Sequence, residues 1–163
     1  MSAPGIITNE TVNIIEAIAP VDINAAGATG NMISMKNAAH CTIIIKSGTW
    51  AAGTSAITVE QAVDVTDSTT TSKAVAFTSM WTNDGVPTTS VLTKTTVTAN
   101  TFNVDVALSM YVIEISADML DVDNGYDCLQ VLSATPGANA CLLDATYILS
   151  GTRYSGDNAA LSN

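Results

Sequence analysis

Apolar and polar residues alternate along much of this 163-residue chain, and the alternation limits the folds open to it. In residues 57–65 the odd positions are mostly branched and apolar, whereas Thr58, Glu60 and Asp64 occupy even positions. Successive side chains of a β-strand point to opposite faces, so a period of two predicts a strand with one buried face.

Nine segments have this strand-like character and are rich in Val, Ile, Thr and aromatic residues. Clusters of Gly, Pro, Asn and Asp separate them, as expected for turns. Many short strands without a sustained helical period predict an all-β fold, an antiparallel β-sandwich that is jelly-roll-like. An immunoglobulin-like strand order would give the same alternation, so the strand order stays open. The segments are 11–18, 41–46, 57–65, 74–81, 91–98, 102–106, 111–115, 128–133 and 140–149.

Helical structure is expected at one place only. Ser116 can cap a short helical turn over residues 116–121, with Asp118 in its first turn, and Gly125 ends anything that begins there. The two ends of the chain carry Gly, Pro, Ser and Asn with few large apolar residues. We therefore divide the chain into an N-terminal arm (1–9), a single β-sandwich domain (10–154) and a C-terminal tail (155–163).

The charge balance excludes several classes of partner. Five basic residues stand against fifteen acidic ones, for a net charge of −10, so nucleic acid and anionic membranes are not expected partners. No apolar stretch approaches the roughly 20 residues that span a bilayer. No secretory signal is visible at Met1, so we expect the protein to be made and used without export.

The sequence contains no catalytic motif, so we expect neither enzymatic activity nor a cofactor. His40 is the only histidine and precedes Cys41 in a strand, where neighbouring side chains diverge. The three cysteines lack the C-x-x-C spacing of a zinc or redox site, and each is expected to be a small buried residue. Asp118, Asp121, Asp123 and Asp127 resemble the start of a calcium loop but miss the EF-hand register, because Gly125 comes one position early and Leu132 replaces the final glutamate. A solvated turn is the favoured interpretation, and a different calcium site stays open.

The few aromatic residues mostly alternate with aliphatic ones, as core residues do. Trp50 is the expected exception, because it lies between Gly48 and Gly53 in a turn-rich stretch. An exposed tryptophan could belong to an interface or to a sugar-binding platform, so a carbohydrate-binding sandwich remains an alternative.

The second half of the chain resembles a known group of proteins. Residues 111–121, continuing through Gly125-Tyr126-Asp127 and closing with residues 147–154, resemble small structural proteins encoded near the major capsid gene of tailed bacteriophages. The resemblance covers mainly residues 110–154. It implies a β-rich head decoration or cement protein, located on the outer capsid surface of the virion and made in the host cytoplasm, with no catalytic residue to carry over.

The composition agrees with this implication. Only 12% of residues are charged, so much of the surface is neutral or apolar and suits burial between subunits. The resemblance implies the major capsid protein as partner, and we also expect copies of the chain to associate as a dimer or trimer. Ile6, Ile7 and Tyr154 are the expected anchors, with Trp50 as a further interface candidate. A tail or spike subunit of the virion is the nearest alternative.

Overall fold

The structure is a computed structural model that describes residues 12–66, 72–86 and 88–151. Its strands form antiparallel sheets, which confirms the all-β prediction. The described residues form twelve strands, and three of these, β2, β3 and β6, are only two residues long. The strands are β1 (Val12–Asp22), β2 (Ala28–Thr29), β3 (Ile33–Ser34), β4 (His40–Trp50), β5 (Ser55–Ala62), β6 (Lys73–Ala74), β7 (Ser79–Asn83), β8 (Thr93–Thr96), β9 (Thr101–Val104), β10 (Met110–Ser116), β11 (Cys128–Ser133) and β12 (Cys141–Ser150).

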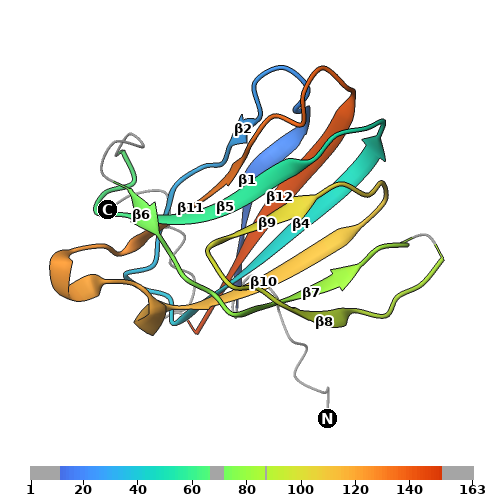
Figure 1. Cartoon of the computed structure of the whole chain (residues 1–163). Helices are drawn as coiled ribbons and strands as arrows, with labels where there is room; N and C mark the ends of the chain where they lie inside the picture. Colours follow the sequence, from blue (N-terminus) through green and yellow to red (C-terminus); the bar gives the residue numbers. More distant parts are fainter. Residues whose placement is uncertain (1–11, 67–71, 87, 152–163) are drawn as a thin grey trace, which may run out of the picture.

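The strands form two sheets whose pairing is nested (Figure 1). The first sheet has the order β1-β12-β4-β10-β7-β8, and the second has β2-β11-β5-β6, with β3 also on β11 and β9 also on β5. Thus β1 pairs with β12, β2 and β3 pair with β11, β4 pairs with β10, and β5 pairs with β9. The hairpin β7–β8 extends the first sheet beyond β10.

One hydrophobic core lies between the two sheets, as the alternation predicts. In β4 of the first sheet Ile43 and Ile45 are fully buried, while Lys46 is exposed. In β5 of the second sheet Ile57 and Val59 are fully buried in the same cluster. Alternate residues of β4 and β5 therefore supply the core, and burial of their apolar area stabilises the fold.

The segment 74–81, expected as one strand, is divided between the two sheets. β6 ends at Ala74 on the second sheet, and β7 begins at Ser79 on the first. Between them Val75 and Phe77 are 0% and 2% exposed. Val75 and Phe77 suggested a continuous strand because they are apolar. They belong instead to the segment that crosses from one sheet to the other, and their side chains pack in the core.

Helical structure is limited to the connection between β10 and β11 in the described residues. The expected turn is present as a short 3₁₀ helix, η1 (Ala117–Met119), and a second one, η2 (Val122–Asn124), follows it. Gly125 ends η2 in the left-handed conformation, with φ of 85°. No helix in the described part of the chain is long and apolar enough to cross a membrane.

The connections β1–β2, β4–β5, β9–β10 and β11–β12 meet at one end of the sandwich, which we call the distal end (residues 22–28, 50–55, 104–110 and 134–141; upper right in Figure 1). A backbone hydrogen bond of 3.0 Å from Ala51 to Ala140 joins two of these connections. The described chain begins and ends at the opposite end, where Val12 pairs with Ser150.

Candidate interaction surface

Exposed apolar residues gather at the distal end and on the neighbouring hairpin. Ten large hydrophobic residues are exposed in the described part of the chain; five of them belong to these regions, and two more, Val21 and Leu142, lie one residue outside the distal end. Single exposed apolar residues are ordinary on a protein surface, but a contiguous group marks an interaction site. The seven are Val21, Val86, Val91, Leu92, Val106, Leu108 and Leu142.

Three of these residues belong to adjoining segments of the chain, and we call them the apolar row: Leu142, Leu108 and Val86. Leu142 lies beside Gly48 in β4, where an added Cβ would be 3.1 Å from the Leu142 Cβ. The Gly48 carbonyl accepts a hydrogen bond from the Leu108 backbone N–H at 3.0 Å. The Leu108 carbonyl in turn accepts one from the Val86 N–H at 3.0 Å. The row therefore runs from the start of β12 across β4 to the loop after β7.

Leu108 has an unfavourable backbone conformation. Its φ of 55° is the only positive value at a residue other than glycine in the described chain. A left-handed L-residue costs about 1–2 kcal/mol because its Cβ crowds the following carbonyl oxygen. Burial of the side chain does not offset this cost, because Leu108 is 51% exposed. Strained residues cluster at functional sites, and this one presents a leucine to solvent.

Two acidic residues, Asp84 and Asp105, lie two and three positions before Val86 and Leu108 of the apolar row. Asp84 and Asp105 lie near Tyr111, whose pKa is raised to about 12 by burial first and then by the charges of Asp84 and Asp105. Lys46, two residues before Gly48 on β4, is paired with Asp144 at 2.9 Å. The distal end therefore combines exposed apolar side chains with negative charge.

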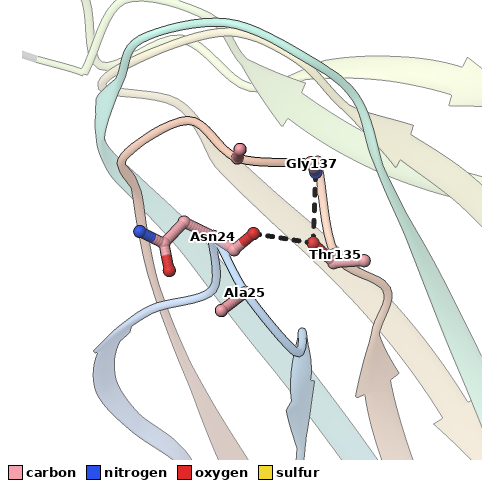
Figure 2. A pocket seen from close by; sticks show the side chains of 5 residues that line it. Asn24, Ala25, Thr135 and Gly137 are labelled. Atoms are coloured by element: carbon pink, nitrogen blue, oxygen red, sulfur yellow. Dashed lines mark hydrogen bonds between the residues drawn. The ribbon is translucent and has the colours of Figure 1, made fainter.

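A shallow pocket lies at the same end, between the β1–β2 and β11–β12 connections (Figure 2). The Thr135 hydroxyl donates a hydrogen bond to the Asn24 carbonyl at 2.9 Å and accepts one from the Gly137 N–H at 3.1 Å. Ala25 and Ala138 complete the lining, which contains no acid, base or thiol. The lining thus offers no general acid or base, and the threonine hydroxyl is used to hold the two loops together.

Trp50 does not lie on the surface, contrary to expectation. Its side chain belongs to the core cluster and the residue is only 9% exposed. Its indole N–H donates a hydrogen bond to the Gly53 carbonyl at 2.9 Å, which closes the turn after β4. We therefore no longer treat Trp50 as an interface or sugar-binding residue. The other expected anchors, Ile6, Ile7 and Tyr154, lie outside the described residues.

Two of the four acidic residues near Gly125, Asp121 and Asp127, are engaged by other side chains. Asp121 forms an ion pair with Lys73 and accepts hydrogen bonds from the Asn124 amide at 2.9 Å, and these contacts lower the Asp121 pKa, Lys73 contributing most. Asp127 lies 3.7 Å from Lys36. Within residues 12–66, 72–86 and 88–151 no three His, Cys, Asp or Glu side chains converge as a metal site would require, and Asp118 and Asp123 join no such group.

His40 and the cysteines have structural contacts. His40 Nε2 pairs with Glu114 Oε2 on the neighbouring strand β10, and Thr42 donates to the same carboxylate oxygen at 3.0 Å. Cys41, Cys128 and Cys141 are free thiols and fully buried. Burial raises the pKa of Cys128 to about 12, with Asp127 adding to the effect, so its reactive thiolate form is disfavoured.

No protein family, curated protein or solved structure matches the chain in the three comparisons made. The geometry described above is therefore the basis for a functional assignment. It defines a β-sandwich with an apolar, acidic end. Sequence patterns missed the apolar row because Val86 and Leu108 lie in turns, where neither helical nor strand periodicity applies; the only available signal was a large apolar residue in a turn.

Proposed function

We propose that the chain is a structural protein of a tailed-bacteriophage virion that binds the outer surface of the major capsid protein shell. Its distal end is the docking surface in this proposal. The single observation that carries it is the apolar row with the strained, exposed Leu108 at its centre. The row lacks a partner within the described chain and has the apolar character of the centre of a protein interface.

The strand order supports the proposal. The nested pairing, first strand with last and second with second-to-last, is that of a hairpin folded into two facing sheets. We infer that this fold is a jelly roll with the hairpin β7–β8 inserted between β5 and β9. Jelly rolls are common in viral structural domains and in lectins, so the fold agrees with a virion role without specifying it.

The negative charge of the chain indicates which charge the partner surface carries. Asp84 and Asp105 lie close in the chain to Val86 and Leu108 of the apolar row, and the net charge is −10. A complementary shell surface is apolar at its centre and basic at its rim. Such steering weakens with ionic strength, so attachment is expected to slow as salt is added.

The proposal is tested first by mass spectrometry of purified virions of the phage that encodes the chain, separated into heads and tails. A decoration protein is present in many copies in the head fraction. Presence in the tail fraction alone would favour the tail or spike alternative and overturn capsid binding. Absence from both fractions would overturn a virion role altogether.

A matched pair of variants tests the docking surface on heads stripped of the protein. Leu108→Gly removes the central apolar side chain and relieves its strain, whereas Ile14→Ser changes a residue of similar exposure, 54% against 51%, on the outer face of the first sheet. We expect Leu108→Gly to weaken head binding about tenfold, or about 1.4 kcal/mol, and Ile14→Ser to bind like the native chain. Equal binding by all three proteins would contradict the assignment of the distal end.

A further inference from the structure

The two edges of the first sheet differ in how well they are protected against pairing with another chain. The edge strand β1 carries Pro20, the charged residues Glu16 and Asp22, and two register shifts against β12. Proline, charge and bulges are the devices by which natural sheets keep an edge from pairing. The β1 edge is therefore closed to a further strand.

The opposite edge, β8, contains no proline, no acid and no register shift, and its protection is limited to its short length and one lysine. Its four residues, Thr93–Thr96, are all exposed, and within the described residues β8 pairs with β7 on one side and with no strand on the other. Lys94 is drawn over the Trp81 ring, 5.7 Å from its centroid, on the face of the hairpin. The ammonium group thus lies over one face of the sheet. The other three residues of β8 are uncharged threonines.

β8 also lacks packing of its own. A strand with both faces and one edge in water contributes little buried area, and its order in this fold depends on the ladder to β7. Immediately before it, Val91 and Leu92 are 67% and 42% exposed, so Val91 is the most exposed large apolar residue of the described chain. An additional strand beside β8 would pair its backbone groups and cover these side chains.

We propose that β8 is the dimerisation edge of this protein, pairing antiparallel with β8 of a second copy across a two-fold axis. The first sheets of the two copies then form one continuous sheet, with Val91 and Leu92 at the junction. The proposal concerns self-association and stands independently of capsid binding. It also selects a dimer over a trimer, because an edge that pairs with itself closes after two subunits.

Charge favours a second copy as the occupant. Two chains of net charge −10 repel, so they associate best through a surface without acids. Residues 85–104 contain no acid and one base, Lys94, so pairing here keeps the carboxylates of the two copies apart. The distal end, with Asp84 and Asp105 beside the apolar row, would instead bring like charges together.

Sedimentation equilibrium over a wide concentration range tests the proposal on the full-length chain. The native protein is expected to approach twice the chain mass of 16.8 kDa as its concentration rises. With Thr95 paired with Thr95 of the second copy at the two-fold axis, Thr95→Asp places two acids opposite each other and is expected to raise the dimer dissociation constant at least about tenfold. Asn103→Asp adds the same charge to the exposed position of the equally short strand β9 and is expected to leave dimerisation unchanged.

Cysteine cross-linking keeps the test decisive if Thr95→Asp fails to fold. All three native thiols are buried, so a single cysteine introduced at each of positions 93–96 is the only accessible thiol. Oxidation is expected to yield a disulfide-linked dimer for at least one of these variants, and not for Asn103→Cys. A native chain that stays monomeric, a dimer insensitive to Thr95→Asp, or cross-linking only at residue 103 would overturn the proposal.

Discussion

The hydroxyl of Tyr147 joins the two sheets by accepting a hydrogen bond from the Val131 backbone N–H at 2.8 Å. Tyr147 lies on β12 in the first sheet, and Val131 lies on β11 in the second. Both residues are fully buried. The contact is therefore a polar link through the apolar core between two facing sheets.

Removal of this hydroxyl is expected to destabilise the fold. Tyr147→Phe keeps the ring but leaves the buried Val131 N–H without this acceptor, which lowers the free energy of unfolding by about 1–3 kcal/mol. Tyr126→Phe is the control, because Tyr126 is only partly buried and its ring, which lies under Lys73, is retained. Urea denaturation measures both; a loss of stability no larger than that of the control would contradict the role of the hydroxyl.

Two glycines of similar backbone geometry are expected to differ in their tolerance of alanine. Gly53 and Gly137 have φ of 91° and 101°, so alanine is strained at both. A Cβ at Gly53 would lie 2.2 Å from the Pro136 carbonyl oxygen, whereas nothing lies within 4 Å of one at Gly137. Gly53→Ala should therefore lower the free energy of unfolding more than Gly137→Ala, by a margin above about 1 kcal/mol. Equal losses in thermal denaturation would show that the β4–β5 turn does not need this close approach.

Stability is expected to fall at alkaline pH. Burial raises the pKa of Tyr111 and Cys128 to about 12, and it raises the pKa of Tyr147 and Cys41 as well. Unfolded Cys and Tyr lose their protons near pH 8.5 and 10, so above these values the unfolded chain binds fewer protons than the native one. The stability is thus fully present below about pH 8 and is lost progressively as the pH rises towards 12. Urea midpoints that stay constant from pH 8 to about 11 would contradict this burial.

The native thiols are expected to be inert towards a thiol reagent. Cys41, Cys128 and Cys141 are each fully buried, and none forms a disulfide. Ellman's reagent should label none of the three thiols in the native chain and all of them in denaturant, since the reaction needs an exposed thiolate. The labelling rate in buffer then reports unfolding. Rapid native labelling at any site would show that the sandwich opens locally there.

The sequence predicted which face of a strand is buried better than it predicted where strands end and the chain crosses between sheets. Alternation in residues 57–65 identified odd positions such as Val59 as the apolar face of β5, because side-chain direction depends only on local backbone geometry. The same pattern joined residues 74–81 into one strand, although Val75 and Phe77 belong to a crossing between sheets. Burial produces the same apolar signal in a strand and in a buried connection, so the pattern could not separate them.

The candidate site was less accessible to sequence reasoning than the core. Trp50 was expected on the surface because glycines surround it, yet its indole packs inside the sandwich and bonds to Gly53. Leu108 carried no periodic sequence signal, because its placement follows from backbone contacts with Gly48 and the loop at Val86. Such contacts join residues distant in the chain, and their existence depends on which strands become neighbours.

The sequence by itself determined that this protein is built from half-buried strands, that it is strongly acidic and that its thiols and most aromatic residues are core material. These properties are local or additive, since strand periodicity and net charge do not require knowledge of strand order. The tertiary structure alone decided the nested pairing, the link between Tyr147 and Val131, and the contrast between the protected β1 edge and the open β8 edge. Each of these depends on long-range pairing, which the alternation of side chains leaves undetermined.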